Sequence, residues 1–289
     1  MSNRATLRRV ILFFKAKDKL NDQHAAFVGS IPENYDRYLG PCLFEPFARD
    51  IVRRVQVLGG DSVLEIACGT GIVTRHLRDT LPKTTKLVAT DLNESMLGYA
   101  RAKFGPDELV EWKQADASSL PFADDSFDAV VCQFGLMFFP DKAAALREVH
   151  RVLRPGGVFV FNVWDSIDKN ELAQITHQTV SSFFENDPPN FYEVPFTLHN
   201  QEILADLLAK AGFNESKFSV LSKTGISPTA ADAAKGLIQG NPVIVEINQR
   251  AAADAQAIEA AVAEAVSARC GDEPVCAKLQ AIICVTIRN

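Results

Sequence analysis

The stretch V-L-E-I-A-C-G-T-G at residues 63–71 decides how this 289-residue chain is predicted to fold. Its first five residues form a short apolar run of the kind found in buried strands. The glycines at positions 69 and 71 allow the tight turn that must follow, and residues 72–81 then show the apolar spacing of a helix. We therefore predict a strand, a glycine-rich turn and a helix, in that order.

The same alternation extends along the chain as far as residue 164. Four further apolar runs predict strands, and two stretches between them have helical spacing. The strands are predicted at 86–90, 109–114, 127–133 and 158–163, and the helices at 94–104 and 143–153. Short buried strands that alternate with helices form a parallel sheet with crossover connections. The pattern therefore predicts a doubly wound α/β sheet.

Beyond residue 165 the alternation is looser. Helical spacing covers four stretches, and two more runs are typical of strands. The helices are predicted at 168–185, 200–211, 229–239 and 243–269, and the strands at 216–224 and 281–287.

The charge of the chain is unevenly distributed. Residues 1–20 hold six basic side chains against one acidic, whereas the rest of the chain holds 24 basic against 35 acidic. Proteins that grip the phosphates of nucleic acid cluster lysine and arginine, so this acidic body excludes nucleic acid as the main partner. The apolar run at 10–14 is too short for a membrane span or a signal peptide. The basic start is therefore predicted to be an amphipathic helix or a flexible arm, without stable membrane insertion.

The six cysteines lack the close pairs that zinc sites use. Cys270 and Cys276 are five residues apart with no histidine nearby, so no metal is expected. Scattered thiols are typical of proteins in a reducing compartment, which predicts a cytoplasmic location.

Candidate site residues follow the first three predicted strands. Gly69 and Gly71 follow the first strand, Asp91 ends the second and Asp116 follows the third. In open α/β sheets ligands bind at the carboxyl ends of strands, where glycines permit close approach and a carboxylate can accept from both ribose hydroxyls. A second acid can receive an adenine amino group. Each feature alone has a structural explanation, but the three together predict a nucleoside site.

The glycine turn argues against a dinucleotide. A pyrophosphate site needs the pattern G-x-G-x-x-G, and the third glycine is missing after Gly71. The lysine of a phosphate-binding P-loop is missing as well. A NAD-linked oxidoreductase is therefore disfavoured, and the turn is better suited to a small zwitterion beside the nucleoside.

Four segments resemble the motifs of class I S-adenosylmethionine-dependent methyltransferases. Residues 63–71 resemble the first motif, residues 91–97 the second and residues 116–128 the third, and R-V-L-R-P-G-G at 151–157 matches the turn before the fifth strand. The likeness is strongest to the small-molecule branch that includes the ubiquinone and menaquinone C-methyltransferases. It covers residues 61–164 well and implies S-adenosyl-L-methionine as the cofactor.

The resemblance implies a role for each matched position. Glu65, Ala67, Gly69 and Gly71 would surround the methionine part, Asp91 would hold the ribose, Leu92 and Met96 would flank the adenine, Asp116 and the Ala117 amide would bind its edge, and the Gln133 backbone carbonyl would receive the ammonium. Ala67 departs from the family pattern, which has glycine there, and would narrow the pocket. Tyr35, in a segment resembling the cofactor cover of this branch, either packs on the methionine end or anchors the arm.

The resemblance also implies the architecture. It is a Rossmann-like, mostly parallel sheet of seven strands with an antiparallel last strand, an N-terminal helical arm and helical lid insertions. Residues 1–289 would then form a single methyltransferase domain. Its parts would be an arm or cofactor cover at 1–40, a cofactor-binding core at 41–164, an acceptor-pocket lid at 165–215, and C-terminal strands with a helical insertion at 216–289.

The predicted activity is in-line methyl transfer to a small molecule, by a monomer or a homodimer. Because the donor is already activated, such enzymes mostly supply proximity and alignment, and they share no single catalytic residue. His177, Tyr192 and His199 are candidates, since they lie in the segment that would roof the acceptor pocket.

Aromatic residues near the predicted mouth favour an apolar or aromatic acceptor. With one methionine they are Phe134, Met137, Phe138, Phe139, Phe183, Phe184, Phe191 and Phe196. Two alternatives stay open: a catalytically silent protein that binds S-adenosylmethionine or another nucleotide, and the less favoured NAD-linked oxidoreductase.

Overall fold

The framework of the protein is a seven-stranded sheet with the strand order β3-β2-β1-β4-β5-β7-β6. The computed structural model describes residues 27, 29–58, 60–250 and 254–289. The strands are β1 Ser62–Ile66, β2 Lys86–Asp91, β3 Glu111–Gln114, β4 Phe127–Gln133, β5 Leu153–Trp164, β6 Glu215–Ser227 and β7 Val275–Ile287. Neighbours among β1–β5 are parallel, and β7 is antiparallel to both β5 and β6. The predicted doubly wound sheet with an antiparallel last strand is confirmed.

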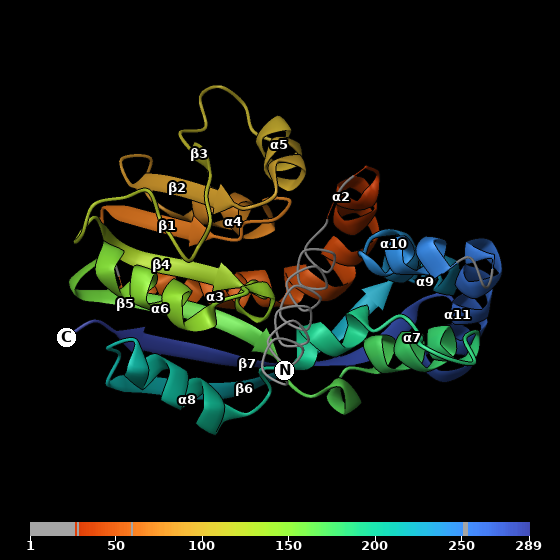
Figure 1. Cartoon of the computed structure of the whole chain (residues 1–289). Coiled ribbons are helices and arrows are strands. Elements are labelled where there is room, and N and C mark those ends of the chain that lie inside the picture. The colour runs from red at the N-terminus through yellow and green to blue at the C-terminus, as the bar shows by residue number, and fades with distance from the viewer. Residues whose placement is uncertain (1–26, 28, 59, 251–253) are drawn as a thin grey trace, which may run out of the picture.

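Helices connect and flank these strands (Figure 1). They are α2 Ile31–Asn34, α3 Glu45–Leu58, α4 Ile72–Thr80, α5 Glu94–Ala102, α6 Lys142–Val152, α7 Glu171–Ser182, α8 Gln201–Lys210, α9 Ala230–Gln239, α10 Val243–Arg250 and α11 Ala255–Cys270. A π-helical stretch, Tyr35–Phe44, joins α2 to α3, and 3₁₀ turns occupy Leu136–Phe138, Ile167–Lys169 and Phe191–Phe196.

Strand β1 lies inside the sheet, where it pairs with β2 on one side and β4 on the other. All five of its residues are buried, as expected for a parallel strand covered on both faces. The chain order reverses between β1 and β4, so the topological switch point lies at their carboxyl ends. In Figure 1 these strands point toward α2 and the cluster formed by α7, α9, α10 and α11.

The β6–β7 pair is longer than the sequence indicates. β7 was predicted at 281–287, but it begins at Val275 and pairs with β6 along its whole length. Its partner β5 ends opposite Ala281, so the first six residues of β7 extend beyond the sheet as a two-stranded ribbon. Residues 275–280 alternate between buried and exposed, and this alternation hides them from a search for continuous apolar runs.

Three other predicted bounds are corrected. The single helix expected at 243–269 is two helices, because Asp254 caps a new one by accepting from the Gln256 amide. The helix expected at 168–185 is shorter, since Asn170 engages carbonyls of the preceding turn before α7 begins. Strand β5 starts at Leu153 rather than at residue 158, with a register shift opposite β4 between Phe127 and Ala129.

The predicted N-terminal helical arm falls largely on residues 1–26, outside the described residues. The division of the chain at residues 40, 164 and 215 stays a prediction. Within the described residues, no helix has both the length and the apolar character needed to cross a bilayer.

Candidate functional site

A large cavity lies at the carboxyl ends of β1, β2 and β4, where the nucleoside site was predicted. The space of this strand-end cavity, including the part that is open to solvent, is about 940 Å³. Nine of the predicted positions line it: Tyr35, Ala67, Gly69, Asp91, Leu92, Met96, Asp116, Ala117 and Gln133. The π-helical stretch and the ends of four strands, β1 to β4, therefore meet at one place.

The turn after β1 is held in a conformation that favours glycine. Ala67 and Gly69 have φ values of +52° and +56°, in the left-handed region. Such a φ is strained for alanine, which accounts for the family preference for glycine at position 67. A Cβ on Gly135, in the turn after β4, would stand 2.6 Å from the Ala67 Cβ. The floor of the cavity thus has room for one methyl group, and Ala67 supplies it.

Asp91 joins the turns after β1 and β2. Its Oδ2 accepts from the Gly69 amide at 2.8 Å, and its Oδ1 accepts from the Asn93 amide at 2.8 Å. Burial raises the pKa of Asp91, and these backbone hydrogen bonds oppose the rise. Each carboxylate oxygen has a second lone pair that these bonds leave open. The carboxylate is therefore held rigidly while it keeps acceptor capacity toward the cavity.

Asp116 and Leu92 lie at another part of the same cavity. Asp116 Oδ1 accepts from the amide and the hydroxyl of Ser118, each at 2.8 Å, and Oδ2 takes no part in these bonds. Leu92 is 54% exposed and lines the cavity, so its side chain is accessible to a ligand there. Met96 is buried and packs close to Gly69.

Glu65 lines a smaller adjoining space of about 310 Å³, the Glu65 cavity, which shares Tyr35, Ala67, Gly69 and Gln133 with the strand-end cavity. Its side chain is 2% exposed and accepts from the Thr74 hydroxyl at 2.6 Å. Burial raises the pKa of Glu65 to about 8, although the Thr74 bond opposes the shift; the nearby Asp91 carboxylate raises it further. Each of the two acids therefore opposes the ionisation of the other, and a cation bound beside them would favour their charged forms.

No lysine, arginine or histidine among the described residues lines either of these two cavities. Within the same residues, the buried oxygens Thr70 Oγ1 and Gln133 Oε1 have no hydrogen-bond partner, and both residues line the Glu65 cavity. Acids and unpaired acceptors without a protein cation favour a ligand that carries positive charge and N–H donors.

Gly71 lies apart from both sets of lining residues. It precedes α4 with φ +80°, and a Cβ there would stand 3.0 Å from the Ala100 Cβ. The structure therefore gives Gly71 a backbone and packing role, and its predicted contact with the methionine part stays a prediction.

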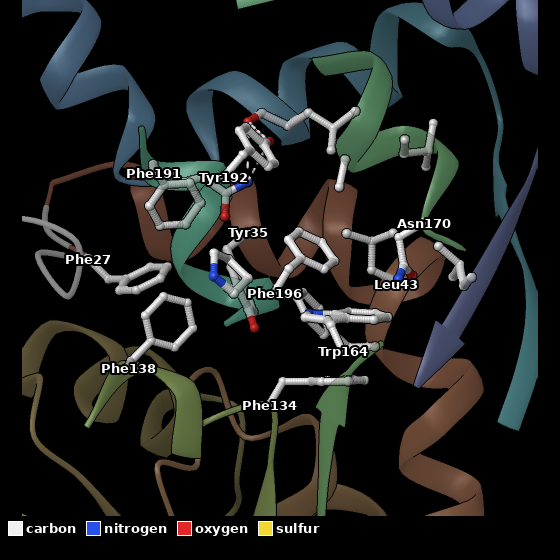
Figure 2. Close-up of a pocket in the computed structure, with 17 residues that line it drawn as sticks. Phe27, Tyr35, Leu43, Phe134, Phe138, Trp164, Asn170, Phe191, Tyr192 and Phe196 are labelled. Atoms are coloured by element: carbon white, nitrogen blue, oxygen red, sulfur yellow. Dashed lines mark hydrogen bonds between the residues drawn. The ribbon is translucent and has the colours of Figure 1, made fainter. Parts of the chain in front are cut away.

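A second large space, the apolar cavity, adjoins the strand-end cavity. It encloses about 620 Å³, and the two share Phe27, Tyr35, Phe134 and Phe138 (Figure 2). Of the aromatic residues singled out in the sequence, Phe134, Phe138, Phe191 and Phe196 line it. No carboxylate or histidine among the described residues does so. Tyr35 is stacked on Phe44, with ring centroids 4.6 Å apart, and lines all three cavities.

Phe134 and Trp164 form one wall of the apolar cavity as a stacked pair, with ring centroids 3.8 Å apart and planes at 8° (Figure 2). Phe134 has a φ of +51°, and the buried Asn162 stabilises this conformation by accepting from the Phe134 amide at 2.9 Å. The pair is therefore fixed by the ends of β4 and β5.

The three candidate residues in the predicted lid have different positions. Only Tyr192 lines the apolar cavity, and its hydroxyl donates to the Leu237 carbonyl at 2.6 Å. Burial raises the pKa of Tyr192 well above its usual value. His177 on α7 and the exposed His199 line none of the three cavities, and His199 Nδ1 is 2.7 Å from the Phe196 carbonyl.

Several residues that line the apolar cavity could not be assigned to it from the sequence. Phe44 is brought in by the π-helical stretch, Asn170 by the turn before α7, Leu279 by the β6–β7 ribbon and Asn241 by the G-N-P turn between α9 and α10. The turn itself could be recognised, but not the cavity that it faces.

The chain is similar in sequence to known methyltransferases. A model of the methyltransferase domain matches residues 64–161. The demethylmenaquinone methyltransferase of Lysinibacillus sphaericus is 34% identical over 50% of this chain and 63% of its own length. The ubiquinone/menaquinone biosynthesis C-methyltransferase UbiE of Escherichia coli is 35% identical over 53% of this chain and 66% of its own length. The chain thus spans a little under two thirds of these relatives.

A solved structure agrees with the fold. The crystal structure of a putative methyltransferase from Bacillus halodurans superposes with a TM-score of 0.54 at 19% identity, over 83% of this chain and 99% of that one. At this identity the likeness supports the architecture alone.

Proposed function

Because the chain belongs to the class I S-adenosylmethionine-dependent methyltransferases, we propose that it transfers a methyl group from S-adenosylmethionine to a small apolar aromatic molecule. The observation that carries this proposal is the junction of two unlike cavities. One is acidic and has no cationic side chain among its described lining residues, and the other is aromatic. They meet at Tyr35 and Phe134.

The strand-end and Glu65 cavities suit the cofactor by charge. S-adenosylmethionine supplies a methyl group already activated by the positive sulfonium, and it also carries an ammonium. Glu65 and Asp91 would offset these charges, and the unpaired Gln133 Oε1 would accept from the ammonium. NAD would instead place a negatively charged pyrophosphate among carboxylates, which the electrostatics disfavour.

In this proposal, different cavity residues bind different parts of the cofactor and the acceptor. Asp91 binds the ribose with its remaining lone pairs, Asp116 Oδ2 binds the adenine amino group, and Leu92 covers the adenine ring. Tyr35 and Phe134 align the acceptor at the boundary and exclude water from it.

The apolar cavity supports an acceptor that needs no strong base from the protein. Its titratable side chains are Tyr35 and Tyr192, whose pKa values are both raised by burial. The acceptor must therefore be nucleophilic by itself, as an ionised phenol or an electron-rich ring carbon is. The relatives named for quinone methylation support this choice of a flat aromatic acceptor.

The test combines binding and turnover. Titration calorimetry should show S-adenosylhomocysteine binding and no NAD binding, and tritium from labelled S-adenosylmethionine should enter at least one member of a panel of phenols and hydroxynaphthoquinones. NAD binding without S-adenosylhomocysteine binding would overturn the proposal. Binding with no labelled product across the panel would favour the silent alternative.

Variants make the same test specific to the site. Asp91→Ala should weaken S-adenosylhomocysteine binding at least tenfold, that is by at least about 1.4 kcal/mol. The matched control is Asp206→Ala, since Asp206 is exposed on α8, pairs with Lys210 and lines none of the three cavities. Equal affinities for the two variants would contradict the role of Asp91.

A further inference from the structure

The polar groups of the apolar cavity are few, and most of them are satisfied by the protein. The Asn170 amide donates to the carbonyls of Asp165, Ser166 and Gln280, and its Oδ1 accepts from the Gln280 amide at 3.0 Å. The donors of the Asn170 amide are therefore used within the protein, and one of the two lone pairs of its Oδ1 is already engaged.

The Tyr192 hydroxyl is engaged in both directions. It donates to the Leu237 carbonyl at 2.6 Å and accepts from Asn241 Nδ2 at 3.3 Å. Asn241 Nδ2 also donates to the Leu237 carbonyl at 3.2 Å. This closed arrangement ties the 3₁₀ turn of Tyr192 to the end of α9.

The same bonds fix the orientation of the Asn241 amide. Only its nitrogen can donate to both the Leu237 carbonyl and the Tyr192 oxygen. Exchanging nitrogen and oxygen would place Oδ1 against the Leu237 carbonyl, where two acceptors would face each other. Asn241 Oδ1 must therefore point away from this group.

Asn241 Oδ1 has no hydrogen-bond partner within the described residues. Asn241 is 8% exposed and lines the apolar cavity, so its oxygen is an acceptor in largely apolar surroundings. Leaving such an atom without a donor costs free energy, which a bound ligand can recover. Figure 2 shows its partner Tyr192 across the cavity from the Phe134–Trp164 pair.

The other polar side chains of the described cavity wall are less suited to accept from a ligand, and Asn170 Oδ1 is already engaged by the Gln280 amide. The indole nitrogen of Trp164 can only donate, and the Tyr35 hydroxyl belongs to a residue at the boundary with the strand-end cavity. Asn241 Oδ1 is thus the acceptor available on the Tyr192 side.

We propose that Asn241 determines acceptor specificity by accepting a hydrogen bond from a hydroxyl group at the end of the acceptor away from the reacting atom. The inference rests on the proposed function, because it takes the apolar cavity as the acceptor site. A molecule of the same shape without that donor leaves Oδ1 unpaired in the complex and binds more weakly.

The test measures binding rather than turnover. Titration calorimetry in the presence of S-adenosylhomocysteine compares 2-naphthol, which carries a donor, with 2-methylnaphthalene, which has nearly the same shape and carries none. The wild type should prefer 2-naphthol by about fivefold or more, the effect of one hydrogen bond to an otherwise unpaired acceptor. Asn241→Leu, a change of similar volume, should reduce the preference to about one, and Asn241→Ala should do the same if the leucine variant misfolds.

Tyr192→Phe is the matched control. It removes the hydroxyl beside Asn241, but the bond from Asn241 Nδ2 to the Leu237 carbonyl still orients the amide. This variant should keep the preference for 2-naphthol. A preference retained in Asn241→Leu or lost in Tyr192→Phe would overturn the assignment. Failure of both probes to bind the wild type would overturn it together with the acceptor site, whereas intact selectivity without any methyl transfer would contradict the proposed function alone.

Discussion

A single methyl group added to Gly135 should disturb the floor of the strand-end cavity. The new Cβ would stand 2.6 Å from the Ala67 Cβ and 2.8 Å from Cys132 Sγ. Carbon atoms pack best about 3.5–4.0 Å apart, so one of the two loops must move by about 1 Å. Gly135 has a φ of −98°, which any residue adopts, and the effect is therefore steric.

Gly135→Ala is expected to lower the free energy of unfolding by about 1–3 kcal/mol, the usual cost of overpacking. For a chain of this size that corresponds to a fall in Tm of roughly 2–10 °C, measurable by calorimetry. Gly98→Ala is the matched control, because a Cβ at this position in α5 meets no atom within 4 Å. It should leave the Tm unchanged or raise it slightly.

A second substitution identifies the contact that causes the loss. Ala67→Gly removes the methyl group that Gly135→Ala would strike, and glycine accepts the φ of +52° without strain. The double variant should recover about 1 kcal/mol relative to the sum of the single changes, a coupling typical of residues in contact. The Cys132 contact remains and limits the recovery. An unchanged Tm for Gly135→Ala, or strict additivity in the double variant, would refute the proposed close approach.

Three further predictions concern charge, the exposed leucine and the histidines. The raised pKa of Glu65, about 8, means that the folded chain holds this proton at pH values where the unfolded chain has lost it. As the pH rises from about 4.5 to about 8, the free energy of unfolding should therefore fall by up to about 1.4 kcal/mol per pH unit. Urea unfolding of Glu65→Gln should show a smaller fall over the same pH range. Equal slopes of the free energy of unfolding against pH in the wild type and the variant would contradict the raised pKa. Leu92→Ala should weaken S-adenosylhomocysteine binding by roughly fivefold with little change in Tm, because the side chain is 54% exposed, and a large loss of stability would point to a core role. His177→Ala and His199→Ala should keep methyl transfer within about twofold of the wild type, since neither residue lines a cavity; a loss of about 100-fold, the scale of general-base catalysis, would restore them as candidates.

The sheet and its strand ends could be predicted because they depend on local patterns. Buried parallel strands read as short apolar runs, and the carboxyl ends of neighbouring strands must meet at one edge. The strand pattern alone thus placed Asp91 and Asp116 together, and the family resemblance added Gln133; all three line the strand-end cavity.

For the proposed acceptor site, the sequence predicted the apolar, aromatic character of the cavity but not most of the residues that close it. The aromatic composition indicated an apolar cavity, but the residues that close it come from segments far apart in the chain. Asn241 was hidden in a turn, and Leu279 in the alternating part of β7. The start of α11 could not be predicted because strong helix formers surround Asp254, and this single capping aspartate decides the boundary.

A crystal structure of the chain with S-adenosylhomocysteine tests the central claim most directly. The adenosyl group should lie between Asp91 and Asp116, with the amino-acid end beside Glu65 and the sulfur facing the apolar cavity at Tyr35 and Phe134. Density for the ligand elsewhere, or a sulfur directed away from that cavity, would contradict the account.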